Sequence, residues 1–290
     1  MVRLEYSIEL AYQIADSRCD FIFMIHAAQT AQQRIVSESL EILPALESDL
    51  HTDPASRSRI LRLTANAGPL TLRYRATVDV QHHVDPPEQV PEIAVRALPA
   101  AVLPFLVPSR YCQSDRLQRL ALKEFGALRQ GYGRAQTICE WVNQRVTFQS
   151  NSSTAETSAL DTLIDEAGVC RDFAHLMIAL CRAVNLPARF VTGIDYGADP
   201  ALGPLDFHAY VEVFLGRRWY LFDPSGNAIP MGFVRMATGR DAADCAFATM
   251  FGSVDSWQPV IHIEALPDDS GRLTLPSHVA GALSTDAEAG

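Results

Sequence analysis

The stretch Gly168-Val169-Cys170-Arg171-Asp172-Phe173-Ala174-His175 decides the fold, because it carries the chain from a loop into an apolar helix. We expect this helix to run from Cys170 to Val184, since Asn185-Leu186-Pro187 then ends it. A cysteine in the first turn of a helix lies at the positive end of the helix dipole, which favours the thiolate form. A cysteine that only packs as a small apolar side chain would also fit here. The stretch therefore makes Cys170 a candidate nucleophile that needs a base.

Helix geometry separates Cys170 from the other reactive side chains of its own helix. At about 100° per residue, His175 lies about 140° around the helix from Cys170, so the two side chains diverge. This argues against a zinc site built from the pair, and we expect His175 to pack or to form hydrogen bonds. Cys181 lies about 16 Å along the axis, too far for a disulfide.

The segment Asp206–Gly226 predicts a β-hairpin with His208 near its start and Asp223 at its end. With Gly216-Arg217 as a two-residue turn, Asp223 pairs with Tyr210 and lies one diagonal step, about 7–8 Å, from His208. A register shifted by one residue would send Asp223 to the opposite face. Asp223 could also simply cap the turn that follows it. A carboxylate directed at an imidazole fixes its tautomer and stabilises the imidazolium, so the hairpin can supply the base for a cysteine nucleophile.

The chain divides into a β-rich region 1–95, a mixed region 96–266 and a flexible C-terminal tail 267–290. Alternating apolar residues in the first region predict short strands separated by a turn at 66–69, and hence an antiparallel β-sandwich. A proline-rich stretch from 85 to 108 marks the boundary. The mixed region predicts an α+β unit in which the Cys170 helix packs on an antiparallel sheet. Its expected helices and strands are 115–128, 134–146, 159–166, 170–184, 188–194, 207–215, 219–222 and 257–263.

Composition excludes several classes of protein. The chain of 290 residues has a net charge of −10 and no run of Lys or Arg, which gives nucleic-acid binding little support. No stretch approaches the roughly 20 apolar residues of a membrane helix, so we expect no membrane association. The N-terminus does not read as a signal peptide, and the six cysteines form no Cys-x-x-Cys pair. We therefore expect free thiols and a cytoplasmic protein.

The chain resembles the bacterial transglutaminase-like proteins of the papain-like superfamily of cysteine peptidases and acyltransferases. The resemblance covers roughly residues 100 to 265 and rests on Gly168–Leu176, Asp206–Val213 and Trp219–Pro224, with a further likeness at Gly239–Asp244. The β-rich first region looks like the region commonly fused to such domains. The family pattern often has Trp after His-Ala, where this chain has Tyr210.

The resemblance implies that Cys170 is the nucleophile, His208 the general base and acid, and Asp223 the residue that orients His208. The Cys170 backbone N–H is a natural oxyanion donor, and Gln149 or Asn151 could supply a second. Gly239–Asp244 could support the site or form only a surface turn. We expect no cofactor and no metal, and the sequence does not specify the oligomeric state.

The preferred function is hydrolysis of an amide in a peptide or protein substrate through an acyl-enzyme. A glutamine side chain, a peptide bond and a peptidoglycan-type amide all remain possible targets. Acyl transfer to an amine, as in transglutaminases, shares the same chemistry up to the acyl-enzyme. A catalytically silent binding module on this fold is a third alternative. A metal site built from Cys170, His208 and Asp223 lacks a fourth ligand at sensible spacing.

Overall fold

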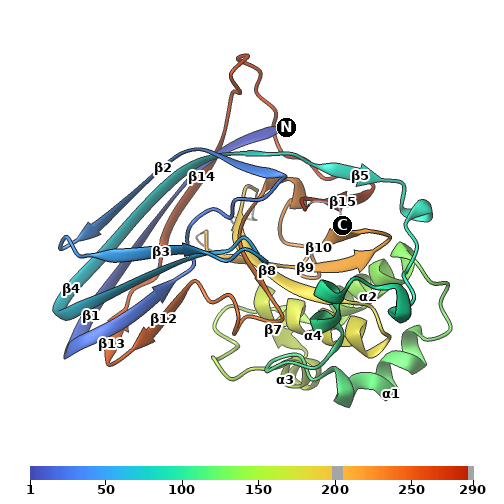
Figure 1. Ribbon diagram of the computed structural model, residues 1–290. Coiled ribbons are helices and arrows are strands. Elements are labelled where there is room, and N and C mark those ends of the chain that lie inside the picture. The colour runs from blue at the N-terminus through green and yellow to red at the C-terminus, as the bar shows by residue number, and fades with distance from the viewer. Residues whose placement is uncertain (198–204, 287–290) are drawn as a thin grey trace.

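A large antiparallel sheet occupies one side of the computed structural model, and a smaller sheet covered by helices occupies the other (Figure 1). The structure describes residues 1–197 and 205–286. The large sheet has seven strands, with the order β12-β1-β4-β2 and with β13 and β14 on β1 and β3 on β4. Its strands are β1 (Val2–Phe23), β2 (Gln33–Leu43), β3 (Ser48–Thr52), β4 (Arg59–Val80), β12 (Ala248–Phe251), β13 (Val254–Ser256) and β14 (Val260–Leu266).

The two longest strands follow the apolar alternation of the sequence. Every second side chain of β1 from Val2 to Ile14 is buried, which is the period of a strand with one covered face. The segment 66–69, predicted as a turn between strands, lies inside β4 instead. A register shift between Ile14 and Arg18 on the facing strand absorbs the disturbance, and Gly68 takes a positive φ of 129° there. The glycine thus marks a bulge in a continuous hairpin.

The second half contains the four-stranded antiparallel sheet β10-β9-β8-β11. Its strands are β8 (Ala188–Asp195), β9 (His208–Leu215), β10 (Arg218–Phe222) and β11 (Phe233–Gly239). The helices are α1 (Ser114–Phe125), α2 (Tyr132–Arg145), α3 (Ala159–Asp165) and α4 (Cys170–Ala183), with 3-10 turns at Pro87–Gln89, Val95–Ala97, Ala100–Leu106 and Pro230–Gly232. The short strands β6 (Thr147–Phe148) and β7 (Ala167–Gly168) pair in parallel just before α4. The predicted α+β class is confirmed, and no helix of the described residues combines the length and the apolarity that crossing a membrane requires.

The β-sandwich expected within the β-rich region is built from other strands than predicted. The strands β1, β2, β3 and β4 all join one sheet, and the short strand at His83–Asp85 belongs to a separate two-stranded sheet, so the β-rich region does not form two packed sheets by itself. The buried face of this sheet packs instead against the four-stranded sheet, from which Ile194, Val234 and Met236 enter the same apolar cluster. The partner sheet therefore comes from the second half of the chain, a pairing that the alternation of apolar residues within strands does not specify.

The hairpin has the predicted register, with Arg218 opposite Leu215 and Phe222 opposite Val211. The apolar face of β9, predicted to cover the core, packs in one cluster with α4; it consists of Ala209, Val211, Val213 and Leu215. The opposite face carries His208 and Tyr210. Helix α4 is buried along nearly its whole length, which fixes its first residue relative to the sheet.

The C-terminal part of the chain joins the large sheet and also completes a separate two-stranded sheet. The predicted strand 257–263 corresponds to β14, which pairs with β1 rather than with the smaller sheet. The strand β15 (Ala282–Ser284), within the predicted flexible tail, is buried and pairs with β5 (His83–Asp85). This part of the tail is packed because its side chains are apolar or hydrogen-bonded, while 287–290 lie outside the described residues. The domain boundaries themselves remain a prediction.

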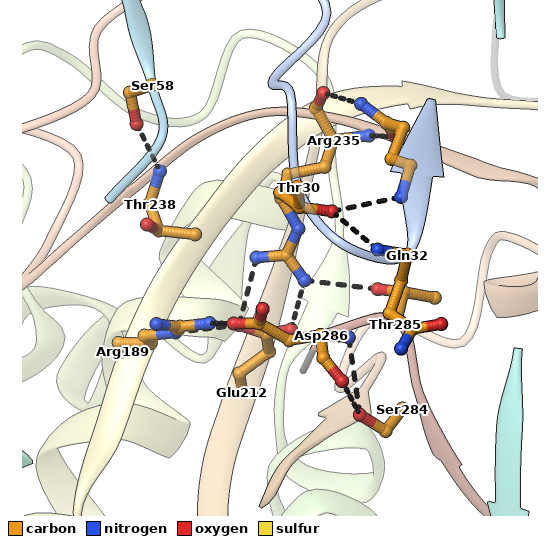
Figure 2. Close-up of polar contacts among 11 residues, drawn as sticks. Thr30, Gln32, Ser58, Arg189, Glu212, Arg235, Thr238, Ser284, Thr285 and Asp286 are labelled. Atoms are coloured by element: carbon orange, nitrogen blue, oxygen red, sulfur yellow. Dashed lines mark hydrogen bonds and ion pairs between the residues drawn. The ribbon is translucent and has the colours of Figure 1, made fainter. Parts of the chain in front are cut away.

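A buried ionic cluster holds the end of the chain against β9 (Figure 2). Glu212 is inaccessible to solvent and accepts hydrogen bonds from Arg189 Nε at 2.7 Å and Arg235 Nη1 at 3.1 Å. Arg189 also pairs with Asp286, and Arg235 Nη2 donates to Thr285 Oγ1 at 3.0 Å. The cluster therefore connects β8, β9, β11 and the segment after β15.

Candidate active site

Cys170 is the first residue of α4, and its local sequence explains the sharp entry into the helix. Asp172 Oδ2 accepts a hydrogen bond from the Val169 backbone N–H at 2.9 Å, which caps the helix start. A Cβ on Gly168 would lie 2.8 Å from Asp172 Cβ, so the glycine makes room for this cap.

The exposure of the cysteines separates Cys170 from the others. Of the six cysteines, all free and all within the described residues, Cys170 alone is half-buried and the other five are buried. Burial raises the pKa of those five thiols; they are Cys19, Cys112, Cys139, Cys181 and Cys245. Cys170 is therefore the thiol that a substrate or reagent can reach.

His208 begins β9 and interacts with both Asp223 and Cys170. Its Nε2 lies 3.5 Å from Asp223 Oδ1, which is an ion-pair distance rather than a short hydrogen bond. Burial alone would lower the pKa of His208, but the interaction with Asp223, with a smaller contribution from Cys170, outweighs burial and raises the pKa well above 6.5. The imidazolium is therefore favoured beside the cysteine.

Asp223 follows β10 and combines the two roles that the sequence left open. Its Oδ1 accepts from Ser225 N at 3.0 Å and Ser225 Oγ at 2.6 Å, and its Oδ2 accepts from Ala228 N at 3.1 Å. Burial raises its pKa, but the His208 charge and these hydrogen bonds outweigh burial and lower it. The turn thus holds an ionised carboxylate in place toward His208.

A cavity of about 1400 Å³ opens onto Cys170 and His208. One wall of the cavity consists of residues from the loop around Phe247, from the strand β12 that follows it and from β14. Another wall consists of residues at the start of α4. Phe207 and Phe247 stack with ring centroids 4.2 Å apart at the cavity wall. The volume exceeds the range of about 300–1,000 Å³ that is usual for small-molecule pockets.

The candidate oxyanion donors differ in where they lie relative to the cavity. The Cys170 N–H belongs to the first turn of α4, where backbone donors have no partner within the helix. The Gln149 backbone N–H donates to Gly168 O at 2.9 Å, and Gln149 does not line the cavity. Asn151, the other candidate from the sequence, does line it. The backbone pairing between β6 and β7 thus occupies the N–H of Gln149.

His175 points away from Cys170, as helix geometry predicts. It is inaccessible to solvent, stacks on Tyr111 at 4.9 Å, and its Nε2 accepts from the Ala242 backbone N–H at 3.1 Å. Burial lowers its pKa well below 6.5, consistent with a neutral acceptor. Ala242 lines the cavity, so the motif Gly239–Asp244 supports one of its walls.

Sequence reasoning missed Asp195, the last residue of β8. This carboxylate is 1% exposed, accepts a hydrogen bond from Tyr210 OH and interacts electrostatically with His208 and Asp223. A single acid at the end of a strand has no distinguishing sequence pattern. Only its pairing with β9, which places it on the face of His208, could have indicated it.

Each half of the chain matches a known protein family. The model of the transglutaminase-like superfamily matches residues 120–224, and the model of the bacterial transglutaminase N-terminal domain matches residues 2–101. A crystal structure from Cytophaga hutchinsonii, described as a putative cysteine protease, is 39% identical with a TM-score of 0.90. The match covers 98% of this chain and 97% of that one.

Curated relatives match over a shorter length. An uncharacterized protein of Mycobacterium leprae is 29% identical over 111 residues, 37% of this chain and 39% of that protein. An uncharacterized protein of Mycobacterium tuberculosis is 32% identical over 109 residues, 34% of this chain and 35% of that protein. The chain thus spans less than half the length of these relatives. The two family models and the full-length structural match show that this chain belongs to the transglutaminase-like superfamily and carries the bacterial transglutaminase N-terminal domain.

Proposed function

We propose that the protein is a cysteine-nucleophile amide hydrolase, a peptidase or amidase, with Cys170, His208 and Asp223 as its triad. One observation carries the proposal: His208 interacts with the only accessible thiol among the described residues on one side and with a buried carboxylate on the other. This is the arrangement that activates a thiol nucleophile. The structural match to a protein described as a cysteine protease supports the same activity.

The reaction begins with attack of the Cys170 thiolate on the amide carbonyl carbon. The Cys170 N–H stabilises the negative oxygen of the tetrahedral intermediate. The His208 imidazolium then donates its proton to the leaving amine, and a thioester with Cys170 remains. Water attacks the thioester as neutral His208 takes a proton from it, the carboxylic acid departs, and the thiolate–imidazolium pair is restored. Asp223 holds His208 and stabilises its charged form throughout.

Acyl transfer to a primary amine is the second candidate. The superfamily match favours it, because the thioester can be resolved by an amine in place of water. The two reactions differ only in the group that attacks the thioester, so a single assay separates them. We favour hydrolysis because the cavity of about 1400 Å³ leaves space for water beside Cys170.

The test is incubation of the protein with a peptide library and a fluorescent primary amine, followed by mass spectrometry. Hydrolysis predicts cleaved or deamidated peptides, and transfer predicts peptides that carry the amine. Cys170→Ala should abolish either product, while Cys181→Ala, a change at a buried thiol of the same helix, should retain it in the folded fraction. Turnover that survives in Cys170→Ala would refute the proposal.

A further inference from the structure

A second carboxylate lies behind the candidate triad. Antiparallel pairing puts Gly193 of β8 opposite His208 of β9, so Asp195, two residues further, shares the face of His208. Asp195 is 1% exposed and cannot exchange its protein contacts for water. Its Oδ1 accepts from the Ile229 backbone N–H at 3.3 Å, and its Oδ2 accepts from Tyr210 OH. Both carboxylate oxygens are therefore held.

Tyr210 connects this carboxylate to the imidazole. Its ring lies edge-on to His208 with centroids 4.6 Å apart and an interplanar angle of 70°. The Tyr210 ring also contacts the ring of Phe233, with centroids 4.6 Å apart and an interplanar angle of 66°. The ring is fully buried, and its hydroxyl is bound to Asp195, so its position is fixed at both ends. A shift of the hydroxyl would move the ring surface against which His208 rests.

The charges around Asp195 come from the candidate site itself. Burial raises the pKa of Asp195 to about 7, and Asp223 adds to the effect, whereas the His208 charge and the Tyr210 hydrogen bond lower it. Cys170 in turn acts on the pKa of Tyr210. Asp195 therefore changes its charge in the range where a thiol enzyme works.

The neighbouring strand adds no free charge next to Asp195. On β11 the residue opposite Asp195 is the apolar Phe233. The next charged residue on that strand, Arg235, is paired with Glu212. The pKa of Asp195 thus depends on His208, Asp223 and Tyr210.

We propose that Asp195 is a positioning residue for His208, acting by holding Tyr210 against the imidazole and by placing a second ionisable carboxyl beside the His208–Asp223 pair. The proposal rests on the proposed function in one respect, the role of His208 as the base. When Asp195 is ionised, its charge favours the imidazolium and hence the reactive pair with Cys170. When Asp195 is protonated, that support is lost while the Tyr210 ring stays in place.

The test follows Cys170 itself and needs no substrate. The rate of Cys170 alkylation by iodoacetamide is measured by peptide mass spectrometry from pH 5 to pH 9 in wild type, Asp195→Asn and Tyr210→Phe. Wild type should show an inflection near pH 7 in addition to the ionisation of the thiol–imidazole pair. Asp195→Asn should lose this inflection and react about tenfold more slowly at pH 8, which corresponds to one unit in the pKa of the imidazole. Tyr210→Phe keeps the ring but releases Asp195, and it should shift the inflection.

One control and one fallback variant make every outcome decisive. Asp206→Asn removes another acid that lines the cavity, and it should keep the inflection. An unchanged profile in Asp195→Asn, or an inflection that disappears in Asp206→Asn instead, overturns the proposal. If Asp195→Asn does not fold, Tyr210→Phe decides, since an inflection that stays in place there refutes the coupling.

The same measurements separate this proposal from the proposed function. Wild-type protein that cleaves amides, with Asp195→Asn matching its pH profile, would refute the positioning role alone. An inflection that depends on Asp195 in a protein that cleaves and transfers no amide would refute the amide chemistry and leave the positioning role in place.

Discussion

Replacing Glu212 by glutamine tests how strand β9 is held behind His208. Glutamine keeps the size of the side chain but removes the only charge that Glu212 offers to Arg189 and Arg235 (Figure 2). Removing one partner of a buried ion pair costs about 3–5 kcal/mol, because a buried charge is left without compensation. Asp286 and Thr285 remain as partners of the two arginines, so we expect the lower end, about 3 kcal/mol.

Urea unfolding measures this loss. With a slope of about 3 kcal/mol per molar urea, the midpoint should fall by about 1 M. Trp219 provides a fluorescence signal near the cluster, since the Arg189 guanidinium lies 4.2 Å from its ring centroid. The control Asp286→Asn removes the carboxylate at the margin of the cluster, whose side chain is 23% exposed, and should cost about 1 kcal/mol or less. A midpoint change in Glu212→Gln no larger than in Asp286→Asn would show that the cluster does not hold β9.

Three further changes test other parts of the structure. Gly193→Ala would place a Cβ 1.9 Å from Val234 O, so β8 and β11 should separate and the free energy of unfolding should fall by about 3 kcal/mol or more. Urea unfolding measures this loss, and an unchanged midpoint would contradict the close approach. Asp223→Asn should lower kcat/KM at least about a hundredfold, because a neutral amide does not stabilise the His208 imidazolium; a variant with wild-type kcat/KM would remove Asp223 from the triad. Since burial raises the pKa of Asp195 from 3.8 to about 7, the folded state keeps a proton there that the unfolded chain loses, and stability falls as the pH rises across that range. Asp195→Asn should reduce this fall by about 3 kcal/mol between pH 4 and pH 7. Urea unfolding at the two pH values measures it, and an equal loss of unfolding free energy in wild type and variant would contradict the prediction.

The local parts of the fold could be predicted because short-range rules determine them. The two-residue turn at Gly216-Arg217 sets the hairpin register, and this register brings Asp223 to the side of His208. Gly168 and the apolar helix that follows likewise predict where α4 begins, and thus where Cys170 lies.

The long-range parts could not be predicted, because apolar alternation says which face of a strand is buried but not which strand is its neighbour. Nothing in β14 specifies β1 as its partner, more than two hundred residues earlier in the chain. The surroundings of Gln149 could not be predicted for the same reason, since its backbone N–H donates to Gly168 O beside a pairing of two very short strands. The place of Asp195 beside His208 could not be predicted, because it depends on the alignment of β8 with β9.

The pairing of β1 with β12, β13 and β14 has a consequence for biosynthesis. Strand β1 is synthesised before β12, β13 and β14, yet one edge of β1 stays uncovered until those later strands have emerged from the ribosome. The same late segments supply Phe247, Ala248 and Ile263 to the cavity wall. A nascent chain that already contains Cys170 and His208 therefore lacks this wall of the cavity, and the candidate site is completed only when the later strands have folded.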